Sequence, residues 1–141
     1  MKFGKLSNVE EVDFSIPDLR FVNSNTNPSS ETNIYLGTTG WSNKEWNCSY
    51  YPKGTKSATY LSEYGNLFNT IELNSTHYHI PSAERVNTWK SKVQEGFTFC
   101  PKVPQDISHR SNLASETSQT NTFFRAIQGF ENTLGTAFMQ V

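Results

Sequence analysis

Two alternating kinds of apolar segment constrain the fold of this chain more than any other feature. Short apolar runs alternate with longer runs in which apolar residues recur at helical spacing. The pattern predicts strand, helix, strand, helix, strand, helix and strand at residues 33–37, 58–68, 70–74, 82–93, 97–103, 120–130 and 135–141. Alternation of this kind is typical of βαβ units with parallel strands, so the sequence predicts an α/β fold.

The first part of the chain lacks these signals. Residues 1–32 are predicted to be an irregular N-terminal extension, and the polar, turn-rich tract at 23–33 is typical of a linker. The folded domain is therefore expected at residues 33–141.

Composition and motifs argue against several functional classes. The net charge of -1 gives no electrostatic footprint for tight nucleic-acid binding. No run approaches the ~20 apolar residues of a membrane span, and the N-terminus lacks a signal-peptide pattern. The two cysteines have no CxxC spacing, so a cytoplasmic protein without disulfides is predicted. Because no GxGxxG or GxxxxGK[ST] motif follows the first strand, a Rossmann or P-loop nucleotide site is disfavoured.

Each predicted strand has one apolar and one mixed face. In the second strand, Ile71 and Leu73 share one face, whereas Glu72 and Asn74 share the other. Polar members gather at the carboxyl ends of the strands. An open sheet covered by helices on both sides is apolar on both faces, whereas a (β/α) barrel carries its chemistry at the inner carboxyl-terminal rim. The pattern therefore favours a TIM-type (β/α) barrel.

The number of predicted strands is half of what such a barrel needs. The chain supplies four strands, whereas a full barrel has about eight. Four strands leave two unpaired edges and an uncovered inner face. We expect an N-terminal fragment of a longer protein, and the competing interpretation is a half barrel that assembles with a copy of itself. In both cases the remaining half or a second copy is the expected partner that covers the core.

Four blocks of sequence carry a family resemblance: LGTTGWSNKEWNCSYYPKG, FNTIELNSTHYHIPS, TWKSKVQEGFTFCPKVPQDISH and LGTAFMQV. In this order they resemble the N-terminal half of the domain of unknown function 72 (DUF72, YecE-like) family. The resemblance covers about Tyr35 to the end and implies a TIM-type barrel, in a family with no settled reaction. The chain departs from the family pattern at His77 and His79, where the family often has Phe and Arg.

Three residues are predicted to be catalytic. Glu72 and Lys102 have the same inward parity on neighbouring strands about 4.8 Å apart, so their side chains could meet. They would then act as an acid/base pair, or as an anion-binding lysine with a carboxylate partner. The alternative is a structural ion pair that fixes strand register. His109 follows on a loop that can fold back over the barrel mouth.

Ligand-binding candidates are the polar and aromatic residues that follow the strands: Thr39, Trp41, Trp46, Tyr51, Asn74, Tyr78 and Gln140. The aromatic loop after the first strand is either a stacking wall for a sugar or base, or a loop with its own small core. His77 and His79 form a weak metal motif without a further ligand at useful spacing, so no metal and no cofactor is predicted. On the helices, Trp89, Phe123, Phe124 and Phe130 are predicted core residues.

These predictions indicate a ligand or active site at the carboxyl-terminal rim. A hydrolase- or isomerase-like activity on a phosphorylated, sugar or nucleic-acid-type compound suits a carboxylate, a lysine and aromatic walls. The alternatives are a non-catalytic nucleotide or nucleic-acid binding module and an assembly role for a half barrel. The sequence leaves open whether the protein is an enzyme.

Overall fold

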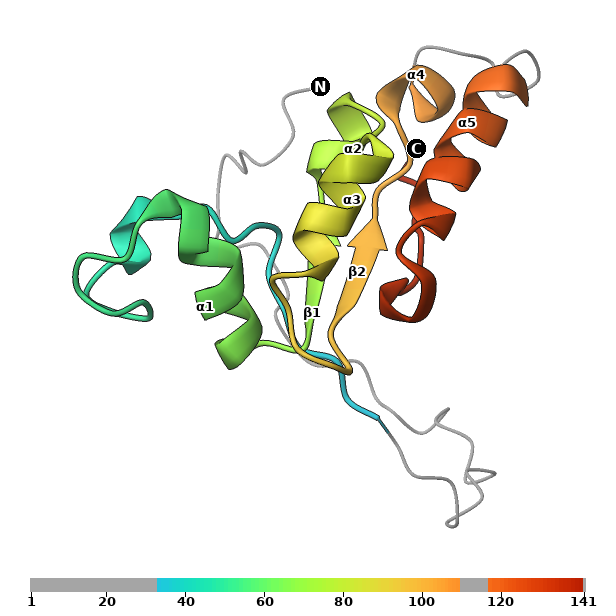
Figure 1. Cartoon of the computed structure of the whole chain (residues 1–141). Helices are drawn as coiled ribbons and strands as arrows, with labels where there is room; N and C mark the ends of the chain where they lie inside the picture. Colours follow the sequence, from blue (N-terminus) through green and yellow to red (C-terminus); the bar gives the residue numbers. More distant parts are fainter. Residues whose placement is uncertain (1–32, 110–116, 141) are drawn as a thin grey trace, which may run out of the picture. The chain divides into compact units, whose positions relative to one another are not determined.

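The computed structural model describes residues 33–109 and 117–140, so the predicted extension at 1–32 lies outside the described residues. The regular elements, in chain order, are η2 (Lys44–Trp46), η3 (Ser57–Thr59), α1 (Tyr60–Leu67), β1 (Thr70–Leu73), α2 (Ser75–Tyr78), α3 (Ala83–Lys90), β2 (Thr98–Pro101), α4 (Gln105–Ser108), α5 (Thr117–Gln128) and η4 (Glu131–Thr133) (Figure 1). Within the described ranges, no helix has the length and apolar character that a membrane crossing requires.

The sheet consists of two parallel strands. β1 pairs with β2 in the register that sets Thr70 against Thr98 and Glu72 against Cys100. This pairing, with helices after each strand, confirms the predicted α/β fold with a parallel sheet.

Two further segments lie alongside the sheet, at the positions of the predicted first and fourth strands. On the β1 side, the amides of Asn69 and Glu72 donate to the carbonyls of Leu36 (3.3 Å) and Thr38 (3.0 Å). On the β2 side, Gly135 N–H donates to Phe99 O at 2.8 Å. The segment of the first predicted strand, β1, β2 and the segment of the fourth predicted strand therefore lie side by side in the order of the sequence.

The two outer predicted strands are incomplete, which corrects the expectation of four full strands. Neither segment contributes an extended strand to the described sheet. Within the described residues, the first segment forms backbone hydrogen bonds along β1 and the fourth along β2, and each has a strand on one side only. Ile34 and Leu36, apolar residues of the predicted first strand, are 79 % and 65 % exposed. Val141 lies outside the described residues.

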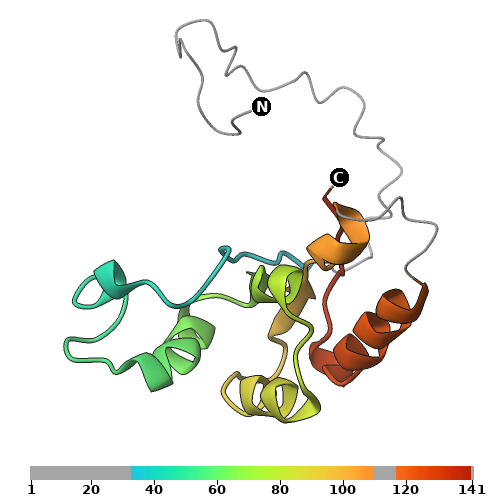
Figure 2. The ribbon, with the colours of Figure 1, turned by 90° about the horizontal axis from the view of Figure 1, so that it is seen from above.

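The faces of the two strands divide as their sequence parity predicts. Ile71, Leu73 and Phe99 are buried, whereas Glu72 and Cys100 are half-buried on the opposite face. The apolar face packs against the helices, and Figure 2 shows α1, α3 and α5 on that side of the strands.

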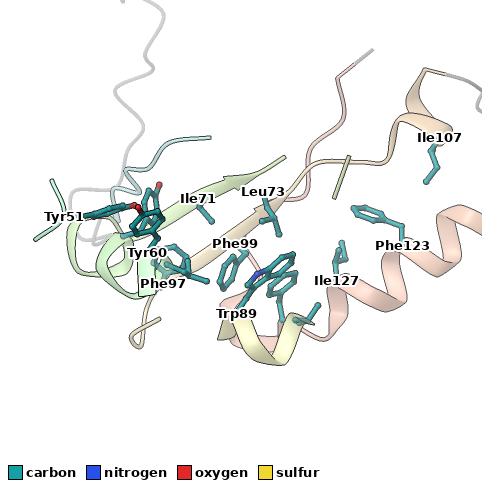
Figure 3. Close-up of a cluster of buried hydrophobic side chains, with 14 residues drawn as sticks. Tyr51, Tyr60, Ile71, Leu73, Trp89, Phe97, Phe99, Ile107, Phe123 and Ile127 are labelled. Atoms are coloured by element: carbon teal, nitrogen blue, oxygen red, sulfur yellow. The ribbon is translucent and has the colours of Figure 1, made fainter. Parts of the chain in front are cut away.

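Aromatic rings form the centre of the core (Figure 3). The ring of Trp89 from α3 lies 6.5 Å from that of Phe99 and 6.2 Å from that of Phe130, measured between centroids. Phe123 is also fully buried, so three of the predicted helical core aromatics are confirmed. The prediction for Phe124 is wrong, since it is 48 % exposed. Phe123 and Ile127, four residues apart, form the buried face of α5, and Phe124, about 100° round the helix from Phe123, points away from it.

Helix α3 begins where the sequence predicts. Ser82 is its N-cap, and the Ser82 hydroxyl accepts a hydrogen bond from Arg85 N–H at 3.2 Å. Glu84 stands in the first turn, where a negative charge is favourable. Val86 and Trp89 are the buried residues of the helix, which ends at Lys90, short of the predicted end at residue 93.

Two single-turn helices, α2 and α4, replace the loops expected after β1 and β2. The buried Thr76 hydroxyl of α2 lies 2.8 Å from Leu73 O and 2.7 Å from Lys102 O. It thus connects α2 to the ends of both strands. Helices this short are too brief to show an apolar period, so the sequence does not reveal them.

Candidate functional site

Glu72 and Lys102 lie on the polar face of the sheet but do not meet. No ion pair joins them in the part of the chain that the structure describes. Lys102 Nζ instead donates to Gln140 Oε1 at 2.7 Å and lies 6.0 Å from the ring centroid of Phe138. The register explains this correction, because it places Cys100 rather than Lys102 opposite Glu72.

Four of the predicted site residues line one pocket of about 210 Å³ at the carboxyl end of β1. We call this the rim pocket; its lining residues are Thr39, Gly40, Trp41, Ser42, Glu72, Leu73, Asn74, Ser75, Arg85 and Trp89. Thr39 and Trp41 come from the segment after the first predicted strand, and Glu72 and Asn74 from the end of β1 and just beyond it. The structure therefore brings together a carboxylate, an amide, a hydroxyl and an indole.

Arg85 is the charged residue of the rim pocket that the sequence did not predict. It projects from the first turn of α3, and its guanidinium carbon lies 5.7 Å from the ring centroid of Trp89. A stacked guanidinium keeps its charge and its hydrogen-bond donors available to a ligand. The spacing between Arg85 and Trp89 could have revealed this contact, because residues four apart share one helix face. The cation of this pocket is Arg85, and not the predicted Lys102.

A second pocket, of about 380 Å³, lies on the polar face of the sheet. We call it the sheet-face pocket; its lining residues are Tyr35, Gly37, Thr38, Thr39, Thr70, Ile71, Glu72, Cys100, Thr136 and Phe138. Two of its lining residues make hydrogen-bond contacts: Thr70 Oγ1 lies 3.4 Å from Cys100 Sγ and accepts a hydrogen bond from Thr98 Oγ1 at 2.9 Å. Glu72 and Thr39 line both pockets, so they stand where the two adjoin.

The aromatic loop after the first predicted strand has a small core of its own, as the second of the two expectations for this loop has it. The centroid of the Trp46 ring lies 5.5 Å from that of Tyr51 and 6.3 Å from that of Tyr64. Tyr51 is 2 % exposed, and its hydroxyl donates to Trp41 O at 2.8 Å. Burial, and secondarily the nearby Tyr64, raises the pKa of Tyr51 to about 12, so this donor stays protonated at neutral pH. Tyr51 thus belongs to the core and Trp46 packs against it, while the ligand-stacking role of the two rings stays a prediction.

Tyr78, His109 and Gln140 lie outside the rim pocket. Tyr78 is 61 % exposed at the end of α2 and lines another hollow with His79. His109 stands at the end of α4, and its ring contacts that of His77 rather than any residue of the rim pocket. Across residues 33–109 and 117–140, no three metal-ligating side chains of the His, Cys, Asp and Glu types gather in one place.

One protein family matches the part of the chain that contains these pockets. The family described as "Protein of unknown function DUF72" matches residues 35–141. The chain belongs to the DUF72 family. The match confirms the resemblance found in the four sequence blocks and covers the segments that build both pockets.

Similar proteins support the assignment to the DUF72 family. The UPF0759 protein YecE of Escherichia coli K12 is 36 % identical over 80 residues, which are 57 % of this chain and 27 % of YecE. The UPF0759 protein YunF of Bacillus subtilis 168 is 33 % identical over 75 residues, or 53 % of this chain and 26 % of YunF. A crystal structure of a DUF72 protein from Enterococcus faecalis V583 matches with a TM-score of 0.59 and 28 % identity, covering 74 % of this chain and 38 % of that one. The similarity thus spans less than two fifths of each of these relatives.

Proposed function

We propose that this DUF72 chain forms the first half of a (β/α) barrel and that its rim pocket binds a sugar-containing or phosphorylated compound. Two observations support the barrel: parallel positions follow sequence order, and one sheet face is polar while helices cover the other. The observation that carries the ligand proposal is the rim pocket itself, in which Glu72, Arg85 and Trp41 face one cavity.

Each of these groups suits one part of such a ligand. The half-buried indole of Trp41 offers a flat apolar surface to a sugar ring. The Glu72 carboxylate and the Asn74 amide can hydrogen-bond to sugar hydroxyls. The Arg85 guanidinium matches the geometry of a phosphate or carboxylate, which it can contact through two parallel N–H groups.

An enzyme built on this pocket would use Glu72 as its acid or base. Proton transfer by a positioned carboxylate is common to sugar isomerisation and to hydrolysis of glycosidic or phosphate esters. The second candidate function, a non-catalytic binding module for a nucleotide or nucleic acid, would use the same side chains without proton transfer. Either function would operate in the cytoplasm, the location predicted from the sequence.

The polar sheet face is the proposed contact for a partner. The sheet-face pocket lies on the side opposite the helices, and Ile34, Leu36 and Met139 are exposed at the flanking segments. We propose that further β/α units of a complete barrel cover this face, with a second copy of the chain as the alternative. The matched share of 38 % of the Enterococcus faecalis DUF72 chain is consistent with the first option.

Replacing Arg85 with glutamine should weaken binding of phosphorylated ligands by about 10- to 100-fold, because a hydrogen bond to a charged group contributes roughly 1.5–3 kcal/mol. The measurement is calorimetric titration with ribose 5-phosphate, glucose 6-phosphate and inorganic phosphate. Arg125→Gln is the matched control, since Arg125 is exposed on α5 and lines neither pocket. Equal behaviour of the two variants, or no binding by the unmodified chain, would refute the proposed anion subsite.

Glu72→Gln should abolish turnover while ligand affinity changes by no more than a few-fold, because glutamine keeps the size and hydrogen-bonding capacity of the side chain but cannot transfer a proton. Turnover is followed with p-nitrophenyl phosphate, with p-nitrophenyl glycosides and by interconversion of sugar phosphates. The binding module predicts a different result, in which no turnover occurs before or after substitution and affinity alone changes. Undiminished turnover in the variant would exclude Glu72 as the acid or base.

A further inference from the structure

His77 and His109 form a side-chain pair that the rim pocket does not use. Their ring centroids are 5.2 Å apart and their planes cross at 79°. His77 belongs to α2, which follows β1, and His109 is the C-cap of α4, which follows β2. Parallel strands carry the helices that follow them to the same end of the sheet, which brings together two of the three histidines of the chain.

The hydrogen bond of His77 fixes which of its nitrogens is free. Its Nδ1 lies 2.8 Å from the backbone carbonyl of Val103. A carbonyl oxygen only accepts hydrogen bonds, so Nδ1 carries the proton and donates. In the neutral ring, Nε2 then has its lone pair available to another partner.

His109 can adopt the same state. Its Nδ1 lies 2.7 Å from the hydroxyl of Ser108, which either donates or accepts. The same hydroxyl lies 3.2 Å from Pro104 O and can turn its proton to that carbonyl. Nδ1–H of His109 then donates to Ser108, and Nε2 becomes the free nitrogen. A histidine that binds a metal through one nitrogen usually donates the other N–H to a carbonyl or a similar acceptor.

The spacing of the rings fits one shared ion. Two imidazoles bound to a tetrahedral Zn²⁺ through nitrogens at about 2.0–2.1 Å have ring centroids roughly 5 Å apart. We propose that His77 and His109 bind one divalent transition-metal ion of the Zn²⁺, Co²⁺ or Ni²⁺ class through Nε2, with its other positions occupied by water or ligand. Imidazole is a preferred ligand for these ions. The site differs from the weak His77–His79 motif, because the structure pairs His77 with His109.

The experiment uses the full 141-residue chain after removal of metal with EDTA. Titration with Co²⁺ should produce visible absorption bands that saturate at one ion per chain, and Zn²⁺ should displace the Co²⁺. In His77→Asn, the amide can still donate to Val103 O, but no atom replaces Nε2. Loss of an orienting partner costs roughly 10- to 100-fold in metal affinity, so removal of a ligand nitrogen should weaken Co²⁺ binding by at least this factor. His109→Asn should have the same effect.

His79→Asn is the matched control, because His79 is exposed and makes no ring contact among the described residues. It should leave Co²⁺ binding unchanged. Circular dichroism and thermal melts establish that each variant is folded. If His77→Asn does not fold, His109→Asn decides the result, because His109 is exposed. Equal Co²⁺ affinity in all three variants would overturn the proposal. So would an intense near-ultraviolet thiolate band abolished by Cys48→Ser or Cys100→Ser, or the absence of binding by the unmodified chain.

Discussion

Replacing Phe99 with alanine should lower the free energy of unfolding by about 3–5 kcal/mol, the range for truncation of a buried aromatic residue. Phe99 lies in β2 and is fully buried. Its ring centroid lies 5.1 Å from that of Phe97, 4.8 Å from that of Phe130 and 6.5 Å from that of Trp89. These rings come from the residue before β2, from α3 and from the turn after α5, and they surround the position. They cannot all move inward, so a cavity remains.

The control for this experiment is Phe124→Ala, the same substitution at an exposed position of α5. Phe124 is 48 % exposed, so its truncation should cost less than about 1 kcal/mol. Urea denaturation followed by tryptophan fluorescence and by circular dichroism gives both values on one scale. Similar losses in the two variants would show that the aromatic cluster around Phe99 does not hold the core together.

The faces of the two central strands were predictable because parity depends only on local sequence. Ile71 and Leu73 alternate with Glu72, and the alternation of side chains along a strand assigns them to opposite faces whatever the tertiary context. The N-cap at Ser82 was predictable for the same reason, since its hydrogen bond reaches only to Arg85. Signals of this kind lie within a few residues of one another.

The contacts of the candidate site depended on information that no single segment contains. Which residue faces Glu72 is set by the register between β1 and β2, and that register assigns Cys100 in place of Lys102. Arg85 reaches the rim pocket because α3 packs against the sheet next to it. The pairing of His77 with His109 likewise requires two short helices that the sequence did not reveal.

The aromatic loop shows why residue type alone does not define a binding surface. Trp46 and Tyr51 have the chemistry of a stacking wall, yet Tyr51 is buried in the core and the partly buried Trp46 packs against Tyr51 and Tyr64. A large ring gains as much free energy from burial in a core as from contact with a ligand, so composition cannot separate the two outcomes. Trp41 differs because its ring borders the rim pocket.

Gly37→Ala should lower the free energy of unfolding by about 2–4 kcal/mol through a backbone clash. A Cβ at position 37 would stand 2.1 Å from Thr70 O and 2.7 Å from Thr70 C, atoms that no side-chain rotation can move. The flanking segment would have to leave β1. It would lose the bond from Glu72 N–H to Thr38 O at 3.0 Å and the one from Thr38 N–H to the Tyr64 hydroxyl at 2.6 Å.

The same displacement should also open the rim pocket, because Thr39 and Trp41 directly follow this segment. Gly40→Ala is the matched control, since its Cβ would meet no atom within 4 Å. Urea denaturation gives the loss of stability, and hydrogen exchange at the amides of Asn69 and Glu72 reports detachment of the segment, because their acceptors are Leu36 O and Thr38 O. Faster exchange at these two amides in Gly37→Ala, but not in Gly40→Ala, is the expected result. Unchanged exchange in both variants would mean that close approach to β1 is not what requires glycine at position 37.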